Sequence, residues 1–232
     1  MSDEPLILSV ETATLSGSIA LARGAEVIGS LNGDPGVSHS NTLLADLDKL
    51  LAETNVDLSS IDLFAVAAGP GSFTGLRIGI ATVKALAATL ERPCTAIPTL
   101  EAVALAGGVS DASVALLAAG RGEVFAQLFS VSSHSVVKPI DQAAHISPKR
   151  MIEKYESFES LVWCGEGAIA QRELIESSAA GKEWRIAPPA SNLATQVAAL
   201  ALTNFRASEI IEPAALRAIY VRPSDAELLT QN

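Results

Sequence analysis

Residues 69–77 read Gly69-Pro70-Gly71-Ser72-Phe73-Thr74-Gly75-Leu76-Arg77, and this stretch decides the fold class. It separates a continuous apolar run, 63–68, from a long stretch of apolar and alanine residues that continues to about Leu90. A buried strand, a glycine-rich turn and a helix in that order form the building unit of α/β proteins. Such a turn can point backbone N–H groups at an anion. A tight structural turn, capped by Ser72 or Thr74, is the alternative.

The known nucleotide and nucleophile motifs are incomplete in this segment. A P-loop requires Gly-Lys-Ser/Thr, whereas Gly75 is followed by Leu76 and Arg77, and a dinucleotide-binding loop requires glycine where Thr74 stands. A nucleophile elbow requires Gly-x-Ser-x-Gly, but Ser72 is flanked by Gly71 and Phe73. We therefore expect a rigid turn in which Gly71 or Gly75 adopts backbone angles that a Cβ atom would penalise.

The elements on either side predict a duplicated plan. Strand-like runs at 6–10, 18–22 and 26–31 form an antiparallel meander, followed by a helix from 38 or 40 to about 53. After the glycine-rich unit come a strand at 94–97 and a helix capped by Thr99. Past Gly107 and Gly108 the order restarts, with strands at 114–118, 123–131, 136–140 and 161–164 and helices at 148–155, 167–177 and 191–205. We predict two α/β lobes, 1–107 and 108–232, each a mixed sheet with packed helices.

Composition and charge narrow the possible partners. The chain has 232 residues, of which 49% are apolar, enough for two cores, and only 4% are aromatic. Its formal charge of −10 repels bare phosphate backbone, so we expect contact with RNA only through a partner. The acidic N-terminus lacks the features of a signal peptide, and no run reaches the roughly 18 apolar residues of a membrane span. We expect a cytoplasmic protein.

The potential metal ligands are few and scattered. Cys94 and Cys164 are far apart in sequence and predict free thiols. His39, His134 and His145 lack the spacing of a metal site and are expected at the surface or in turns. We therefore expect no metal and no cofactor bound by this chain alone.

The sequence resembles one protein family over essentially its whole length. The glycine-rich segment and Val10-Glu11-Thr12-Ala13-Thr14, after the first strand, are similar to the hallmark of the TsaB (YeaZ-like) family, formerly regarded as glycoproteases. Val37-Ser38-His39-Ser40, Arg121-Gly122-Glu123-Val124-Phe125 and Tyr220-Val221-Arg222-Pro223 agree as well. The resemblance implies duplicated RNase H-like lobes of the actin-like ATPase superfamily.

The resemblance also implies a function. A chain of this kind would have no catalytic residue of its own and would support threonylcarbamoyl transfer to the adenosine beside the tRNA anticodon. It would bind a TsaD-like catalytic subunit together with a TsaE-like ATPase, which would carry the ATP and the metal ion. When the chain is alone, we expect a homodimer to cover the apolar surface that the partner would bind. We expect the partner surface on the first two helices, where five apolar residues recur at helical spacing: Leu43, Leu47, Leu50, Val83 and Leu86.

Two departures from the family pattern bear on the alternatives. Glu11 stands where the family commonly has aspartate, and Ala118 stands where a second carboxylate is frequent. Two opposed carboxylates would be needed to hold hydrated Mg²⁺ against a triphosphate. An independent phosphotransferase or ATPase, with Glu11 and the cleft between the lobes as its site, is thus the second hypothesis, and a peptidase using Ser72 is the third. Glu11, Thr12, residues 69–75 and Arg77 are predicted to form either an anion-binding or nucleotide-binding loop or a purely structural one.

Overall fold

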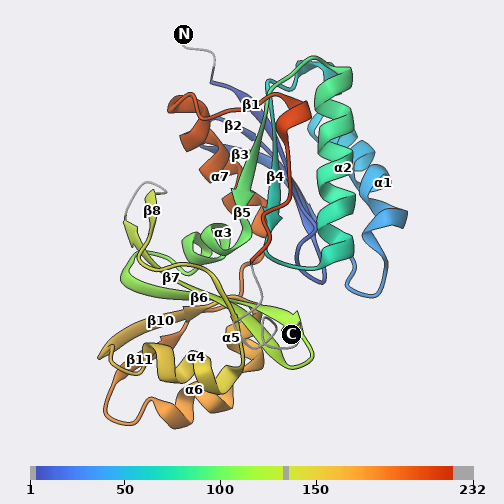
Figure 1. The fold of residues 1–232 in the computed structure, drawn as a ribbon. Coiled ribbons are helices and arrows are strands. Elements are labelled where there is room, and N and C mark those ends of the chain that lie inside the picture. Colours follow the sequence, from blue (N-terminus) through green and yellow to red (C-terminus); the bar gives the residue numbers. More distant parts are fainter. Residues whose placement is uncertain (1–3, 133–135, 222–232) are drawn as a thin grey trace, which may run out of the picture. The chain divides into compact units, whose positions relative to one another are not determined.

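The structure is a computed structural model that describes residues 4–132 and 136–221. The chain divides into two compact units (Figure 1), the first comprising 1–102 and 191–219 and the second comprising 103–190 and the remaining C-terminal residues. The chain passes from the first unit to the second between residues 102 and 103, close to the predicted boundary at 107. The assignment of 191–219 to the second lobe is wrong, because this segment returns to the first unit.

The first unit is built on a five-stranded mixed sheet. Its strands are β1 (Leu6–Glu11), β2 (Ser18–Arg23), β3 (Glu26–Asn32), β4 (Leu63–Gly69) and β5 (Cys94–Pro98), in the order β3-β2-β1-β4-β5. The first three pair antiparallel, as the meander predicts, whereas β4 is parallel to both β1 and β5. The ends of β1 and β4 therefore lie side by side, and the loops that follow them meet at one edge of the sheet.

Helices cover both faces of this sheet. Helices α1 (His39–Thr54) and α2 (Phe73–Thr89) lie side by side on one face, and α7 (Leu193–Arg206) lies on the other (Figure 1). Side chains of β1 alternate between the faces: Leu8 belongs to the core beneath α1 and α2, whereas the Ser9 hydroxyl donates to the Ala194 carbonyl of α7 (2.8 Å). Short 3₁₀ turns, η1 (Leu58–Ser60) and η2 (Pro213–Ala215), connect the longer elements.

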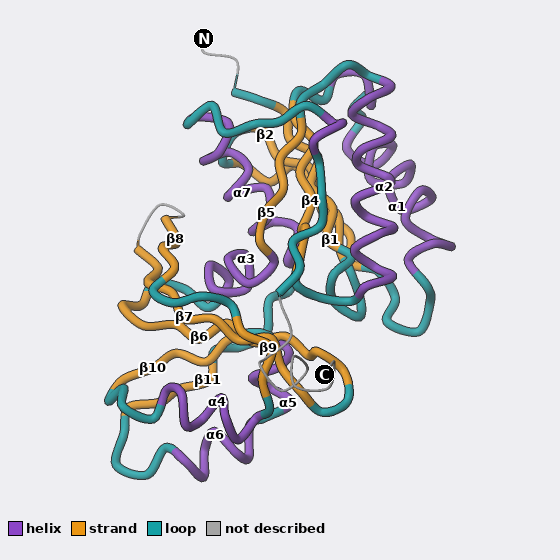
Figure 2. Tube along the Cα trace, viewed as in Figure 1, coloured by secondary structure: helices purple, strands orange, loops and turns teal. Residues whose placement is uncertain are grey.

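The second unit repeats the plan. Its strands are β6 (Ser110–Gly120), β7 (Glu123–Ser132), β8 (Val136–Pro139), β9 (Ala144–Ile146), β10 (Ser160–Cys164) and β11 (Glu183–Ile186). The sheet order is β11-β10-β6-β7-β8, with β9 paired to β7 (Figure 2). Helices α4 (Pro148–Tyr155), α5 (Glu166–Ala170) and α6 (Arg172–Ser178) pack against it, and the division between the units falls within α3 (Thr99–Ala106).

The two sheets confirm the predicted duplication. In each sheet the first strand of the unit, β1 or β6, is central. It is antiparallel to the next strand along the chain, β2 or β7, and parallel to the strand on its other side, β4 or β10. The sequence analysis missed β9 and β11, and the helix predicted at 167–177 is two short helices that meet at Gln171. β9 and β11 contain only three and four residues, too few to show a periodicity.

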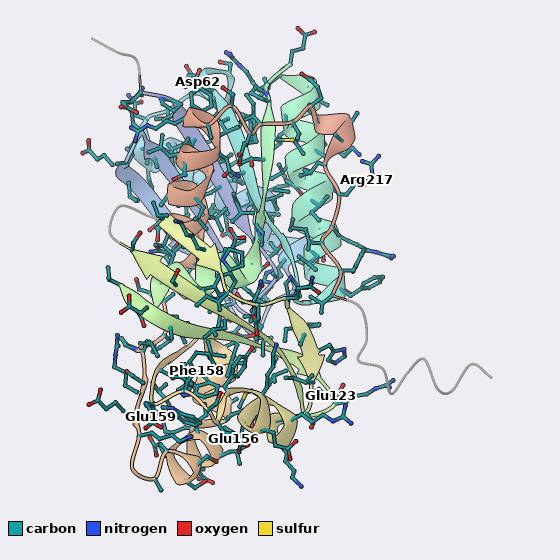
Figure 3. All side chains as sticks on the ribbon, turned by 60° about the vertical axis from the view of Figure 1, so that its left-hand side comes forward. Asp62, Glu123, Glu156, Phe158, Glu159 and Arg217 are labelled. Atoms are coloured by element: carbon teal, nitrogen blue, oxygen red, sulfur yellow. The ribbon has the colours of Figure 1, made fainter. Side chains whose placement is uncertain are left out.

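Long-range hydrogen bonds hold β11 in place. Three backbone carbonyls in the segment before β10 accept these hydrogen bonds, and their residues, Glu156, Phe158 and Glu159, are labelled in Figure 3. The Lys182 ammonium donates to the Glu156 carbonyl, and the Trp184 indole donates to the Phe158 carbonyl (2.9 Å). The Glu183 amide donates to the Glu159 carbonyl (2.8 Å). The pairing of β11 thus depends on contacts between distant residues. No local pattern could have predicted it.

Candidate functional site

The glycine-rich loop after β4 is attached to its neighbours at both ends. The Gly69 amide donates to the Thr99 hydroxyl at the start of α3 (3.1 Å), and the Ser72 amide donates to the Ala13 carbonyl (2.8 Å). Between them, the Gly69–Pro70 peptide bond is cis. Thr99 thus serves the loop, although the sequence suggested that it caps α3. The loop and the turn that follows β1 form one connected structure.

Glycine is required because the loop lies against the backbone of residues 12–13. A Cβ atom on Gly71 would lie 2.6 Å from the Ala13 carbonyl oxygen, and Cβ atoms on Gly75 and Gly79 would overlap the Thr12 carbonyl and hydroxyl oxygens. The Thr12 hydroxyl also donates to the Gly75 carbonyl (2.7 Å). Gly75 belongs to α2 and has helical backbone angles, so the prediction of backbone angles that a Cβ atom would penalise does not apply to it. Glycine is needed at position 75 because the Thr12 backbone lies so close.

Ser72 is the N-cap of α2, as predicted. Its hydroxyl oxygen accepts from the Gly75 amide (3.2 Å), which satisfies one of the free donors at the start of the helix. The two described histidines are engaged elsewhere, because His39 contacts Thr14 and His145 lies 2.7 Å from the Glu123 carboxylate, in the second unit. The structure therefore gives the peptidase hypothesis no support.

Glu11 is turned into its own loop. Its side chain is only 1% exposed, and its carboxylate accepts from the Thr14 amide (2.7 Å) and the Thr14 hydroxyl (2.8 Å). Burial raises the pKa of the Glu11 carboxyl above its usual value, against the opposing effects of these hydrogen bonds and of nearby His39. A carboxylate committed in this way is poorly suited to hold a hydrated metal ion.

His39 is a participant that the sequence analysis missed. It is the first residue of α1, is half-buried, and its Nε2 donates to the Thr14 carbonyl (3.1 Å). The sequence singled out His39 only as part of the string 37–40 and as a residue of the surface or a turn, and gave no signal for this contact. Helix α1, the turn after β1 and the glycine-rich loop thus form one network.

The C-terminal segment also reaches this network. The Ile219 amide donates to the Ala68 carbonyl (2.7 Å), directly before the glycine-rich loop, and Arg217 (labelled in Figure 3) donates to the carbonyls of Ala214 and Leu216. Of the family-like string 220–223, residues 222 and 223 lie outside the described residues, as does His134. The sequence predicted an extended segment here but not its contact with the loop.

The residues predicted to bind a partner lie inside the first unit. Leu43, Leu47, Leu50 and Val83 are buried in its core, and Leu86 is half-buried against the same cluster. They were chosen because their spacing forms a stripe on each helix, but that stripe faces the sheet. Naming them as surface residues is therefore a mistake, while contact of α1 and α2 with a partner stays a prediction.

The exposed faces of α1 and α2 carry other residues. Leu44 is 63% exposed on α1, near Ala45 and Ala52, and α2 exposes Arg77, Ala81, Ala85 and Ala88 at spacings of three and four. At the start of α2, the Arg77 guanidinium lies 3.8 Å from the centre of the half-exposed Phe73 ring. The outer face of α2 is thus rich in alanine.

The two cysteines are buried and poorly suited to nucleophilic chemistry. Burial raises the pKa of the Cys94 thiol to about 11 and that of Cys164 to about 12, which disfavours the reactive thiolate. Ala118 is exposed at the end of β6. Within residues 4–132 and 136–221, no three His, Cys, Asp or Glu side chains gather as a metal site. In the same ranges, no helix has the length and hydropathy needed to cross a membrane.

Comparison with known proteins identifies the family. Residues 36–229 match the model of the TsaD family, tRNA N6-adenosine threonylcarbamoyltransferase. The chain belongs to the TsaD family. Among individual relatives of this TsaD-family chain, the TsaB protein of Bacillus subtilis is 32% identical over 124 residues, which is 53% of this chain and 54% of the relative. The TsaB protein of Escherichia coli is 28% identical over 153 residues, 65% of this chain and 66% of the relative.

These matches span about half to two thirds of the curated relatives. A solved structure supports the fold over a longer range: YeaZ from Pseudomonas aeruginosa has a TM-score of 0.76, with 94% of this TsaD-family chain and all of that chain covered, at 24% identity. The resemblance to TsaB and YeaZ and the duplicated actin-like fold predicted from the sequence are thus confirmed.

Proposed function

We propose that this chain takes part in tRNA threonylcarbamoyladenosine biosynthesis as a non-catalytic accessory subunit. The observation that carries the proposal is the TsaD-family match over residues 36–229, together with the similarity to proteins named TsaB. The site geometry supports the absence of catalysis, since the Glu11 carboxylate is held by Thr14 and the glycine-rich loop is held against residues 12–13.

The proposed partners are a TsaD-like catalytic subunit and a TsaE-like ATPase, which would bind the ATP and the metal ion. The chain would act in the cytoplasm. Its charge of −10 opposes direct contact with tRNA, so the RNA would be held by the partners. In their absence, a second copy of the chain would cover the same surface as a homodimer.

The proposed partner surface is the exposed face of α1 and α2. Alanine side chains let another helix approach closely, and Leu44 provides an apolar contact on the adjacent helix. A charge buried in the middle of such a contact, without a counter-ion, would destabilise it by several kcal/mol. The surface is therefore sensitive to one acidic substitution.

The test combines binding and modification. The wild-type chain is mixed with the catalytic subunit and the ATPase of its own organism, and threonylcarbamoyl transfer to tRNA is measured with and without the chain. We expect transfer to require the chain, and we expect Ala85→Glu to abolish both partner binding and transfer. Ala25→Glu, on the exposed β2–β3 turn, is the matched control and should behave as the wild type. Transfer without the chain would refute the accessory role, and full activity of Ala85→Glu would refute the proposed partner surface.

The same purified chain tests the hypothesis that it is an independent ATPase. ATP hydrolysis by the purified chain alone should equal the background of a buffer blank. Turnover that disappears in Glu11→Ala would replace the accessory role with a catalytic one.

A further inference from the structure

The sequence contains one Asn-Gly pair, Asn32-Gly33, at the end of β3. Asparagine before glycine is chemically labile, because the glycine nitrogen can attack the side-chain carbonyl carbon without hindrance from a side chain. A bond forms between the Gly33 nitrogen and Asn32 Cγ, the bond from Cγ to Nδ2 breaks, and ammonia leaves with the proton of the Gly33 amide. Water then opens the succinimide ring to aspartate or isoaspartate. Asn32 is exposed, so water can reach it.

In the folded chain, hydrogen bonds hold both reacting groups. The Asn32 Nδ2 donates to the Ser191 carbonyl (2.8 Å), and the Asn32 Oδ1 accepts from Asn192 Nδ2 (2.8 Å). The Gly33 amide donates to the Gly17 carbonyl (3.1 Å). Ring closure requires the Asn32 side chain to turn toward the Gly33 nitrogen and that nitrogen to lose its proton. These hydrogen bonds therefore oppose the reaction.

The residues that hold the Asn32 side chain begin α7. Asn192 is the N-cap of this helix, because its Oδ1 accepts from the Thr195 amide (3.2 Å). Its Nδ2 donates to the Leu31 carbonyl (3.1 Å) as well as to Asn32. The Asn32 side chain is therefore fixed while the start of α7 lies on the end of β3. Segments open locally at lower free energy than the whole fold, and a reaction of the open form follows the open fraction.

We propose that Asn32 is a deamidation site that the docked start of α7 protects, and that its modification then weakens this docking. The aspartate product has no Nδ2 donor and directs a carboxylate at the Ser191 carbonyl. Isoaspartate adds a methylene to the backbone where β3 ends. A carbonyl that loses its donor destabilises the docked form, so each modified chain opens more easily. The site belongs to the first unit alone and does not depend on the accessory role proposed above.

The experiment incubates the full chain at mildly alkaline pH, folded and unfolded in urea, and follows deamidation of Asn32 by peptide mass spectrometry. We expect fast reaction in the unfolded chain and slow reaction in the folded chain. Asn192→Asp is the test variant, because its carboxylate still caps α7 but cannot donate to Asn32 or Leu31. Loss of a hydrogen bond shifts an opening equilibrium by about two- to tenfold, so the folded-state rate should rise by about that factor. Asn204→Asp is the matched control: it loses the bond from α7 to Thr95 (3.0 Å), at the other end of the helix, and should keep the wild-type rate.

A second measurement tests the consequence of the modification. Asn32→Asp has the side chain of the product, and amide hydrogen exchange reports the opening of α7 at Ala194, whose amide donates to the Ser18 hydroxyl (2.9 Å). Exchange at Ala194 should be about two- to tenfold faster than in the wild type, from the lost hydrogen bond. Asn41→Asp, at an exposed position of α1, is the control and should exchange at Ala194 as the wild type does.

The exchange measurement decides the matter if Asn192→Asp does not fold. Equal reaction rates of Asn32 in the folded and unfolded wild-type chain would overturn the proposal. Equal folded-state rates in Asn192→Asp and Asn204→Asp would overturn it as well, as would equal Ala194 exchange in Asn32→Asp and Asn41→Asp.

Discussion

Leu47 and Leu44 lie on the same helix, but truncation of Leu47 should destabilise the chain far more than truncation of Leu44. Leu47 is 3% exposed within the core of the first unit, whereas Leu44 is 63% exposed. Replacing a buried leucine by alanine costs about 2–5 kcal/mol, from lost burial and the cavity left behind. Complete burial of a leucine contributes about 1.5–3 kcal/mol, so Leu44→Ala, which loses roughly a third of that burial, should cost at most about 1 kcal/mol.

Thermal unfolding followed by far-UV circular dichroism measures the difference. In a chain of this size, 1 kcal/mol corresponds to about 2–4 °C in Tm, so Leu47→Ala should lower Tm by roughly 4–20 °C and Leu44→Ala by less than about 4 °C. The two units can unfold in separate transitions, so we compare the Tm of the transition that the substitution shifts. Samples are diluted until the chain is monomeric, so that loss of self-association does not mimic loss of stability. A Tm for Leu47→Ala within a degree of wild type, or equal losses in both variants, would refute the assignment of Leu47 to the core.

Three further predictions concern the site and the titrating groups. Gly75→Ala should lower the free energy of unfolding, measured in urea, by about 1–3 kcal/mol because its Cβ overlaps the Thr12 carbonyl. Gly36→Ala, in an exposed turn, is the control and should change the free energy of unfolding by less than about 0.5 kcal/mol. Equal effects of the two substitutions would exclude close approach as the reason for Gly75. Burial raises the pKa of Glu101 from 4.5 to about 7, so the folded state holds this proton more tightly and stability should fall as pH rises from about 4.5 to about 7. Glu101→Gln should therefore gain Tm relative to wild type at pH 8 and not at pH 4, and an equal difference at both values contradicts this. Both cysteines should react with a thiol reagent only on unfolding, and rapid labelling of the native chain would count against their burial.

The fold class could be predicted from the sequence because its signals are local. Short apolar runs separated by polar turns set the meander of β1–β3, and an apolar run followed by glycines and a capping serine set the unit from β4 to α2. The spacing of Leu43, Leu47 and Leu50 likewise determined that one face of α1 is apolar. These features depend on residues within a few positions of each other, so the sequence by itself determines them.

The tertiary structure alone decided what those faces and groups contact. An apolar stripe packs against a sheet or against a partner equally well, and only the position of the first sheet places Leu47 inside. Helix α7 joins the first unit through contacts with strands more than 150 residues earlier, such as the bond from Asn192 to Leu31. The sequence by itself established a carboxylate at position 11 and, far along the chain, a glycine-rich loop at 69–75. Only the parallel pairing of β1 with β4 brings the two together. That this carboxylate accepts hydrogen bonds from its own turn follows from the folded backbone, because the direction of the Thr14 donors is fixed by the contacts of that turn with the loop and with His39.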